Sequence, residues 1–493
     1  MSNTLDTADG QKPDNDDNSD KDDGSETDDA ACPPVTVLDV DDEQVEPYVD
    51  ERATWDKHFI TVVPLQEPHE LTSELYQWAD GVRLTNDYET RFPVVAMMKA
   101  FCRSDVPTKV TAIVFVNSNE NLLTSVSQNM DLLKREIQDI CGMTEGTDYT
   151  FDTIEIEYGS SQEHLLNLTD NIMEAALGDK VNKRLYVDFT YGEKNIPIAL
   201  FQVVLELESS WDVEVDIGFC TYGLVQFFEN CEDTPLLRGI TSLIYHGYRL
   251  QDVEAEPDDF SQGRKHFITF LPLAKDINPM LWHVNETLVL NESEATVYSP
   301  YSIVALLKNV LVDGEEADLT YVKFESDDNR DIEEVLEQIE VNFRNAIDEA
   351  FPNENIRLNR RQIDGNSLSI PYRCEIRDLK KLRNDLLASF DPIDTIYADL
   401  TYGYKTNTLI LYHALAENIL KRPWMQDRTY ACYGHVPHQD LGRDSKVMDI
   451  GEFIKRDVKD FEIRQYGTAE DDDQDYDEAR EDNDMFGGED DET

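Results

Sequence analysis

Two stretches of this chain occur twice, in the same order and at nearly the same spacing. Lys57–Leu65 reads KHFITVVPL, and Lys265–Leu273 reads KHFITFLPL, 208 residues later. Leu185–Leu200 reads LYVDFTYGEKNIPIAL, and Ile396–Leu411 reads IYADLTYGYKTNTLIL, 211 residues later. Matches that keep their order and offset indicate an internal duplication. The chain is therefore expected to fold as two copies of one domain.

Within each copy, short apolar strands alternate with amphipathic helices. In copy 1 we predict strands at 58–63, 110–116, 149–156, 185–189 and 213–219, and helices at 93–102, 120–141, 163–176 and 196–208. In copy 2 we predict strands near 266–271, 319–324, 356–362, 395–400 and 428–432. This alternation predicts an α/β fold of two tandem Rossmann-like, doubly wound and mostly parallel sheets.

The domain boundaries follow from changes in composition. Both ends of the chain are acidic and lack apolar periodicity, so we expect them to be disordered. The segment Gln251–Gly263 (QDVEAEPDDFSQG) is polar, contains Pro and Gly, and is expected to link the copies. The predicted order is a tail at 1–50, domain 1 at 51–250, the linker, domain 2 at 264–440, a short C-terminal extension at 441–467 and a tail at 468–493.

The net charge of the whole chain is −60, from 43 Lys and Arg against 103 Asp and Glu. The two tails carry −15 and −13, so residues 51–467 still carry −32. An acidic body predicts a halophilic archaeal protein, because molar salt screens the repulsion between its carboxylates. An acidic nuclear protein of a eukaryote is the alternative. The same charge disfavours a groove for duplex nucleic acid, which needs Lys and Arg patches, so a nucleotide ligand must be small.

Several other classes of protein lack support in the sequence. No apolar run approaches the ~20 residues of a membrane span, and no signal peptide opens the chain. The seven cysteines form no CxxC pair, so neither a zinc knuckle nor a disulfide framework is expected. There is no G-x-G-x-x-G and no Walker lysine loop, which leaves ordinary dinucleotide and triphosphate sites unsupported. We expect a cytoplasmic protein without a metal or cofactor, and without a membrane partner.

The most specific motif closes the fourth predicted strand of each copy, at Asp188–Lys194 and Asp399–Lys405 (D-F/L-T-Y-G-x-K). Open parallel sheets bind ligands at this end of their strands. Here the glycine permits a tight turn, the following helix presents free N–H groups to an anion, and the lysine adds a cation. The alternative is that the motif is only a structural turn. The occurrence of the whole motif in both copies argues against this alternative. The candidate ligand-binding residues are Thr190, Tyr191, Gly192, Lys194, Thr401, Tyr402, Gly403 and Lys405.

This motif resembles the D-h-T-H-G-x-R signature of the CRISPR-associated Rossmann-fold (CARF) proteins, ancillary sensors of type III CRISPR defence. Asp87–Phe92 (DYETRF) resembles the family's Y-E-T-R-F element and adds Arg91 to the candidates. Gly218–Gly223 (GFCTYG) is similar to the family's closing strand, and Cys432–Gly434 (CYG) repeats it in copy 2. The two copies together cover most of residues 56–436.

The resemblance implies a pair of domains with a cyclic oligoadenylate bound across it. A tandem duplication would supply both members of the pair, so we expect a monomer whose copies pack as a pseudo-dimer. Its ligand would be cyclic tetra- or hexa-adenylate, and it would act as a sensor or regulator with a protein effector as a further partner. Slow, metal-independent cleavage of the ring is one alternative. A duplicated Rossmann-like nucleotide-binding or transferase protein unrelated to CRISPR is another.

The chain also departs from the family pattern. The glycine-rich turn after the first strand is replaced by Pro64–Gln66 and Pro272–Ala274. The signature His is Tyr and the Arg is Lys in both copies, and Arg91 falls opposite about Pro300 in copy 2. An R-x4-6-H pattern would mark a HEPN ribonuclease. The match at Arg428–His435 falls on a predicted strand, so no HEPN domain is expected.

Overall fold

A computed structural model of the chain provides the fold. It describes residues 51–79, 88–103, 105–116, 120–157, 162–178, 182–209, 215–224, 236–244, 253–274, 277–288, 296–312, 315–326, 330–351, 357–360, 368–372, 374–435 and 445–466. The two predicted tails, 1–50 and 468–493, lie outside the described residues.

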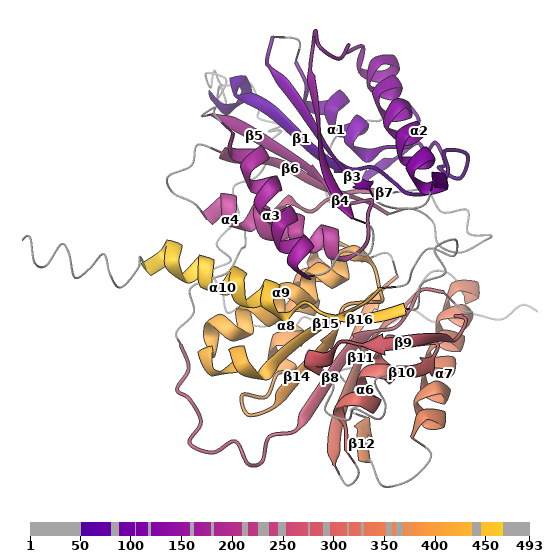
Figure 1. Ribbon diagram of the computed structural model, residues 1–493, viewed down its shortest axis with the longest axis vertical. Helices are drawn as coiled ribbons and strands as arrows, with labels where there is room; N and C mark the ends of the chain where they lie inside the picture. The colour runs from indigo at the N-terminus through magenta and orange to yellow at the C-terminus, as the bar shows by residue number, and fades with distance from the viewer. Residues whose placement is uncertain are drawn as a thin grey trace, which may run out of the picture. The chain divides into compact units, whose positions relative to one another are not determined.

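The first copy forms a seven-stranded sheet in the order β2-β7-β6-β5-β1-β3-β4 (Figure 1). Its central strands β6, β5, β1, β3 and β4 all pair in parallel, and β7 is antiparallel to β6. The strands are β1 (Asp56–Val62), β2 (Gln77–Ala79), β3 (Thr108–Val116), β4 (Thr150–Glu157), β5 (Lys183–Asp188), β6 (Val215–Leu224) and β7 (Leu236–Gly239). The helices are η1 (Glu51–Thr54), α1 (Pro93–Phe101), α2 (Glu120–Glu136) with a π-helical end (Ile137–Cys141), α3 (Gln162–Leu177), α4 (Asn195–Ser209) and α5 (Thr241–Ile244).

The second copy repeats that strand order. Its sheet runs β10-β9-β16-β15-β14-β8-β11-β12, with β13 pairing to β11, so β10 is an additional edge strand. The strands are β8 (Lys265–Phe270), β9 (Met280–Val284), β10 (Thr296–Ser299), β11 (Glu316–Glu325), β12 (Arg357–Arg360), β13 (Ser369–Pro371), β14 (Thr395–Asp399), β15 (Thr429–His435) and β16 (Ser445–Asp449). The helices are η3 (Glu286–Leu288), α6 (Ser302–Val310), α7 (Arg330–Ala350), α8 (Ile376–Ser389), α9 (Lys405–Lys421), η5 (Pro423–Arg428) and α10 (Gly451–Tyr466). The predicted fold class, two tandem Rossmann-like sheets, is confirmed.

The two copies share one hydrophobic core. A helix that is apolar on every side must be covered on every side, and α4 (NIPIALFQVVLELES) has almost no polar face. Helix α9 is buried from Thr406 to Ile419 and contacts α4 directly. Phe201 of α4 meets His413 of α9 edge-on, with ring centroids 5.9 Å apart. The motif helices therefore form the interface of the expected pseudo-dimer.

Helix α10 belongs to this packing, although residues 441–467 were expected to be a short extension. It contacts α9 and also reaches α4 and α3 of copy 1 (Figure 1). Phe453, Ile454, Val458 and Phe461 are buried along it. Its charged residues conceal this apolar face in the sequence, because the mean composition of the segment is polar. The strand before it, β16, pairs with β15 and completes the second sheet.

A histidine repeated in the first strand of each copy is structural. His58 Nε2 lies 2.8 Å from Thr111 Oγ1, and His266 Nε2 lies 2.8 Å from Thr320 Oγ1. Burial lowers the pKa of His58 to about 3, so its ring is neutral at physiological pH. Each histidine thus fastens the central strand of its sheet to the next one, β3 or β11.

The paired histidines lead to a stability prediction. Replacing Thr111 with valine keeps the side-chain volume but leaves a buried His58 nitrogen without this partner. We expect the free energy of unfolding to fall by about 1–3 kcal/mol, and Thr320→Val to cost a similar amount. Denaturant titration measures both. Thr72→Val, at an exposed position, is the control, and an equally large loss there would contradict the assignment.

Candidate functional site

The two D-x-T-Y-G-x-K turns meet where helices α4 and α9 begin. Lys194 Nζ donates a hydrogen bond to the carbonyl oxygen of Gly403 at 2.6 Å. In the opposite direction, Lys405 Nζ donates to the carbonyl oxygen of Thr190. Each lysine therefore crosses the interface and contacts the turn of the other copy. Residues 211 positions apart in the sequence thus form one site.

The motif threonine fastens neighbouring strand ends. The Thr190 hydroxyl donates to Asp188 Oδ1 at 2.5 Å, and it accepts a hydrogen bond from Gly223 N–H at 2.8 Å. In copy 2 the Gly434 N–H donates to Thr401 Oγ1 at 2.7 Å. The threonine and the glycine are 33 residues apart in both copies, and this hydrogen bond gives that equal spacing a structural cause. A Cβ at Gly434 would lie only 2.8 Å from Thr401 Oγ1.

The motif glycine and tyrosine shape the turn. Gly192 and Gly403 have φ angles of +88° and +80°, in the left-handed region that favours glycine. The Tyr402 hydroxyl donates to the carbonyl oxygen of Pro300 at 3.1 Å. The Tyr191 hydroxyl donates to the carbonyl oxygen of Arg91. Arg91 and Pro300 therefore occupy equivalent places in the two copies, as the alignment of the repeats predicted.

A cavity of about 540 Å³ opens between the turns. Of the nine candidates, Thr190, Tyr191, Gly192, Lys194, Gly403 and Lys405 line it. Thr401, Tyr402 and Arg91 are not among its lining residues. The other lining residues, which sequence reasoning missed, are Leu65, Gln66, Glu70, Leu71, Thr72, Tyr76, Glu193, Tyr222, Gly223 and Tyr404. Some of these residues lay in segments that the sequence had already singled out: Leu65–Gln66 at the place of the family's glycine-rich turn, Tyr222 and Gly223 in the closing strand, and Glu193 and Tyr404 inside the motif turns.

Arg91 supports the wall of the cavity from behind. Its Nε donates to the carbonyl oxygen of Leu71 at 3.2 Å, and its Nη1 lies 2.7 Å from Glu136 Oε1. Glu136 also accepts the Arg91 backbone N–H at 3.0 Å and the Thr90 hydroxyl at 2.6 Å. Arg91 thus positions Leu71, one of the cavity residues.

The two lysines lie in an environment that disfavours their charge. Burial lowers the pKa of Lys194 and of Lys405 to about 7. The Asp399 carboxylate of copy 2 partly opposes this shift at Lys194, and Asp188 of copy 1 does so at Lys405. Lys405 also lowers the pKa of Lys194 by repulsion. An anion placed between the two ammonium groups would relieve that repulsion and favour the charged form of both.

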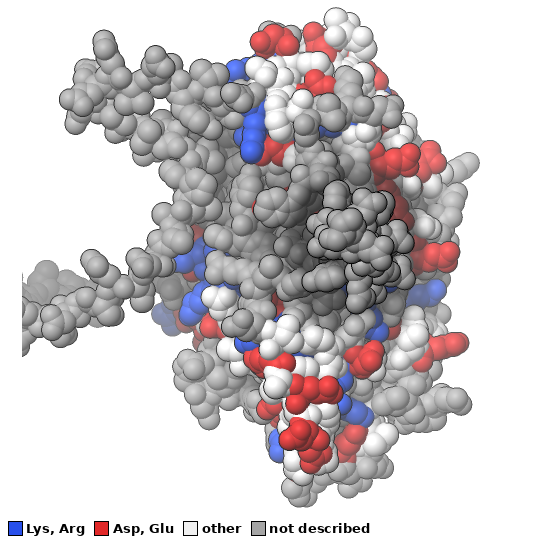
Figure 2. Space-filling model, turned by 90° about the vertical axis from the view of Figure 1, so that its left-hand side faces the viewer, with Lys and Arg blue, Asp and Glu red and all other residues white. Residues whose placement is uncertain are grey.

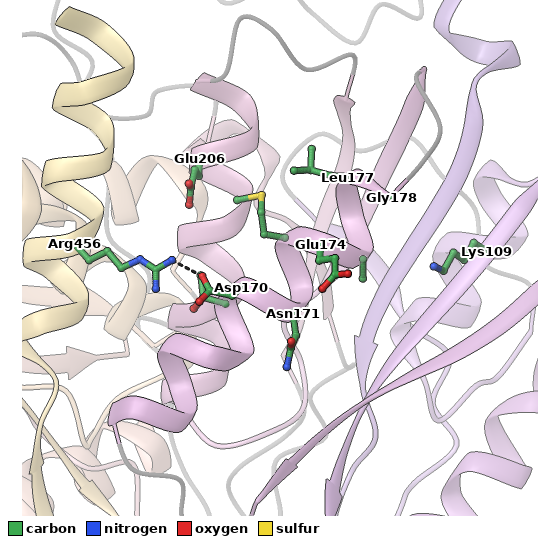
Figure 3. Close-up of a pocket in the computed structure, with 11 residues that line it drawn as sticks. Lys109, Asp170, Asn171, Glu174, Leu177, Gly178, Glu206 and Arg456 are labelled. Atoms are coloured by element: carbon green, nitrogen blue, oxygen red, sulfur yellow. Dashed lines mark hydrogen bonds and ion pairs between the residues drawn. The ribbon is translucent and has the colours of Figure 1, made fainter. Parts of the chain in front are cut away.

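A larger cavity, of about 790 Å³, lies elsewhere, among α3, α4 and α10 (Figure 3). Its charged side chains are of both signs, with Asp170, Glu174 and Glu206 beside Lys109 and Arg456. Arg456 is already paired with Asp170 (Figure 3). Because the charges alternate and are partly neutralised, this cavity favours an anion less than the one between the turns.

Figure 2 shows acidic side chains gathered over both ends of the visible face, with lysine and arginine singly or in small groups among them. Within the described ranges, no group of three or more His, Cys, Asp or Glu is placed to hold a metal ion. None of the helices described is long and apolar enough to span a membrane.

The Arg428 and His435 pair lies at the two ends of the strand region predicted for it. Arg428 ends η5, and His435 ends β15. Arg428 Nη2 donates to the carbonyl oxygen of Ile393 at 2.6 Å. His435 Nδ1 lies 3.0 Å from Glu193 Oε1 of the other copy. Both side chains therefore hold parts of the fold together.

Comparisons with known proteins add little to this geometry. No protein-family model and no curated protein matches the chain. Among solved structures, a UDP-forming α,α-trehalose-phosphate synthase from Burkholderia xenovorans is similar at 11% identity and a TM-score of 0.18. That likeness covers 75% of this chain and 76% of the synthase. A score this low carries no argument about function.

Proposed function

We propose that this chain binds a cyclic oligoadenylate across its two CARF-like copies and acts as a sensor or regulator in antiviral defence. The observation that carries the proposal is the crossed lysine pair. Lys194 and Lys405 come from the same motif in the two copies and lie at one cavity, at the starts of two helices. Phosphates are the ligands that such helix starts and lysines bind best.

The walls of the cavity suit the rest of a nucleotide. Tyr76, Tyr222 and Tyr404 line it together with Leu65 and Leu71. Aromatic and aliphatic side chains of this kind hold bases by stacking and burial. The same proposal includes a protein effector, which would bind this chain differently when the ligand is bound. Neighbouring type III CRISPR genes would favour this function over that of a CRISPR-unrelated nucleotide-binding protein.

Binding stoichiometry tests the proposal. Because both halves of the site belong to one chain, calorimetry with cyclic tetra- and hexa-adenylate should give one ring per chain. Light scattering on the same samples should give the mass of a monomer. Two rings per chain, or a site completed only by a second chain, would contradict the pseudo-dimer as the binding unit. No binding of either ring would refute the proposed ligand.

Slow cleavage of the ring is a second candidate, which the lysine pKa values favour. With both near 7, one lysine can be neutral while the other is charged. The neutral amine would take the proton of a ribose 2′-hydroxyl as its oxygen attacks the adjacent phosphorus. The P–O5′ bond would break, and the charged lysine would protonate the leaving oxygen, leaving a 2′,3′-cyclic phosphate. Chromatography of a labelled ring after incubation distinguishes cleavage from binding alone.

A further inference from the structure

The cavity between the turns is one-sided. Among the residues that the structure describes, Gly403, Tyr404 and Lys405 are its lining residues from copy 2, and the others come from copy 1. Six of the copy 1 lining residues belong to the segment that follows β1, from Leu65 to Tyr76. The two copies therefore contribute equally to the lysine pair but unequally to the space beside it.

The copy 1 segment from Leu65 to Tyr76 is fixed by three sets of hydrogen bonds. The Asn129 side-chain amide donates to the carbonyl oxygens of Pro64 and Gln66, at 2.9 and 2.8 Å. Glu74 and Thr90 exchange two backbone hydrogen bonds of 3.0 Å. Arg91 holds the carbonyl oxygen of Leu71, as described above. The segment is thus fixed to α2 and to the residues that precede α1.

In copy 2 the region beside the corresponding turn is occupied by side chains. Trp282 of β9 is completely buried, and its indole N–H donates to the carbonyl oxygen of Ser299 at 3.0 Å. Its ring lies against Gly434, where a Cβ would come within 2.9 Å of Trp282 Cζ3. The Ser302 hydroxyl lies 2.8 Å from Asp399 Oδ2 and 3.0 Å from Thr401 Oγ1.

Tyr404 closes the copy 2 side further. It occupies the position of Glu193 in copy 1, and only 2% of it is exposed. Its ring packs edge-on against Phe324, with centroids 5.3 Å apart, and near Tyr372, at 6.1 Å. Strand β13 pairs with the end of β11 and places Tyr372 there. Tyr404 is the member of this aromatic group that lines the cavity.

We infer that the site seats a single nucleotide of its ligand, with one base in the copy 1 half and the flanking phosphates at the two lysines. This inference rests on the proposed function and narrows it. A cavity of about 540 Å³ lies within the range of about 300–1,000 Å³ that holds one small ligand. The remainder of a ring lies outside the cavity. The site therefore contacts one base and one or two phosphates of its ligand. Linear adenylates contain the same groups, so they belong to the same ligand class.

Competition binding tests the ligand class. Cyclic tetra- and hexa-adenylate should bind with affinities within about threefold of each other, because ring size is not read. A linear diadenylate with a terminal phosphate should displace either ring, with an affinity within about tenfold of the ring's. If the rings bind and the linear diadenylate does not displace them, the single-nucleotide inference is wrong while the proposed function stands.

A pair of matched variants locates the base. Gln66 and Ala274 are equivalent in the repeat and both exposed, but only Gln66 lines the cavity. Gln66→Trp should fill the copy 1 half and weaken ring binding by about ten- to a hundredfold. Ala274→Trp should change binding by less than about twofold. Equal losses in the two variants, with both melting as the parent protein does, would overturn the one-sided site.

Mononucleotides separate the inference from the proposed function. AMP, GMP, CMP and UMP are titrated beside the rings. Binding of a mononucleotide, sensitive to Gln66→Trp, without binding of any oligoadenylate would refute the proposed ligand and support the single-nucleotide seat. Failure of every nucleotide to bind would overturn both.

Discussion

Replacing Lys194 or Lys405 with alanine is expected to weaken ligand binding by about ten- to a hundredfold each. Each lysine would make a charge-assisted hydrogen bond to phosphate, and losing such a bond costs about 1.5–3 kcal/mol. The two lysines cross the interface in equivalent ways, so similar losses are expected for the two variants. Titration calorimetry of the parent and both variants measures the effect.

The same variants should keep their fold. Each ammonium lies at the positive end of a helix and is partly buried, which are both unfavourable for a cation. The midpoint of thermal unfolding at neutral pH should therefore stay level or rise. Lys99→Ala is the matched control, since it removes one positive charge from an exposed position outside the cavity. Unchanged binding in both cavity variants would show that the crossed lysines only hold the turns together.

Ligand binding is also expected to weaken steeply as the pH rises above about 7. In the free protein the pKa of each lysine is lowered to about 7 by burial, whereas bound phosphates would raise it. Binding then takes up protons above pH 7, so affinity should fall by up to about tenfold per pH unit for each lysine. Calorimetry in buffers of different ionisation enthalpy measures the protons taken up.

An arginine variant isolates this effect. Arginine stays charged throughout the range, so Lys194→Arg should remove that residue's share of the pH dependence of binding.

The free energy of unfolding of the ligand-free protein should change with pH in the opposite direction to the binding affinity. Because the lysine pKa in the folded protein lies below its value of 10.5 in the unfolded chain, stability should rise with pH between about 7 and 10.5. A flat binding profile from pH 6 to 9 would contradict the placement of these lysines at a phosphate.

Much of the fold could be predicted from local patterns. The repeats at Lys57–Leu65 and Lys265–Leu273 identified the duplicated central strands, β1 and β8. Short apolar runs alternating with helices sufficed to predict a parallel α/β sheet. This alternation is a local pattern, because each strand is buried by the strands and helices next to it. Strands β2, β7, β9, β10, β13 and β16 were missed, because strands of only three to five residues carry little periodicity.

The sequence by itself determined the motif turns. The left-handed conformations of Gly192 and Gly403 and the helix starts that follow them are local properties, set by the residue types and their order. These features depend on a few consecutive residues, which is why they can be predicted without the fold. That both lysines belong to one site was expected from the resemblance to a family of paired domains, not from a local pattern.

Only the tertiary structure decided how the site is assembled. That Lys194 contacts Gly403 rather than its own turn depends on the packing of α4 against α9. That Arg91 supports Leu71 depends on the path of the segment after β1. Tyr404, which lines the cavity, packs against Phe324 and Tyr372, which lie far from it in the sequence. Side-chain packing of this kind is a property of the whole core, so no local pattern in the chain records it.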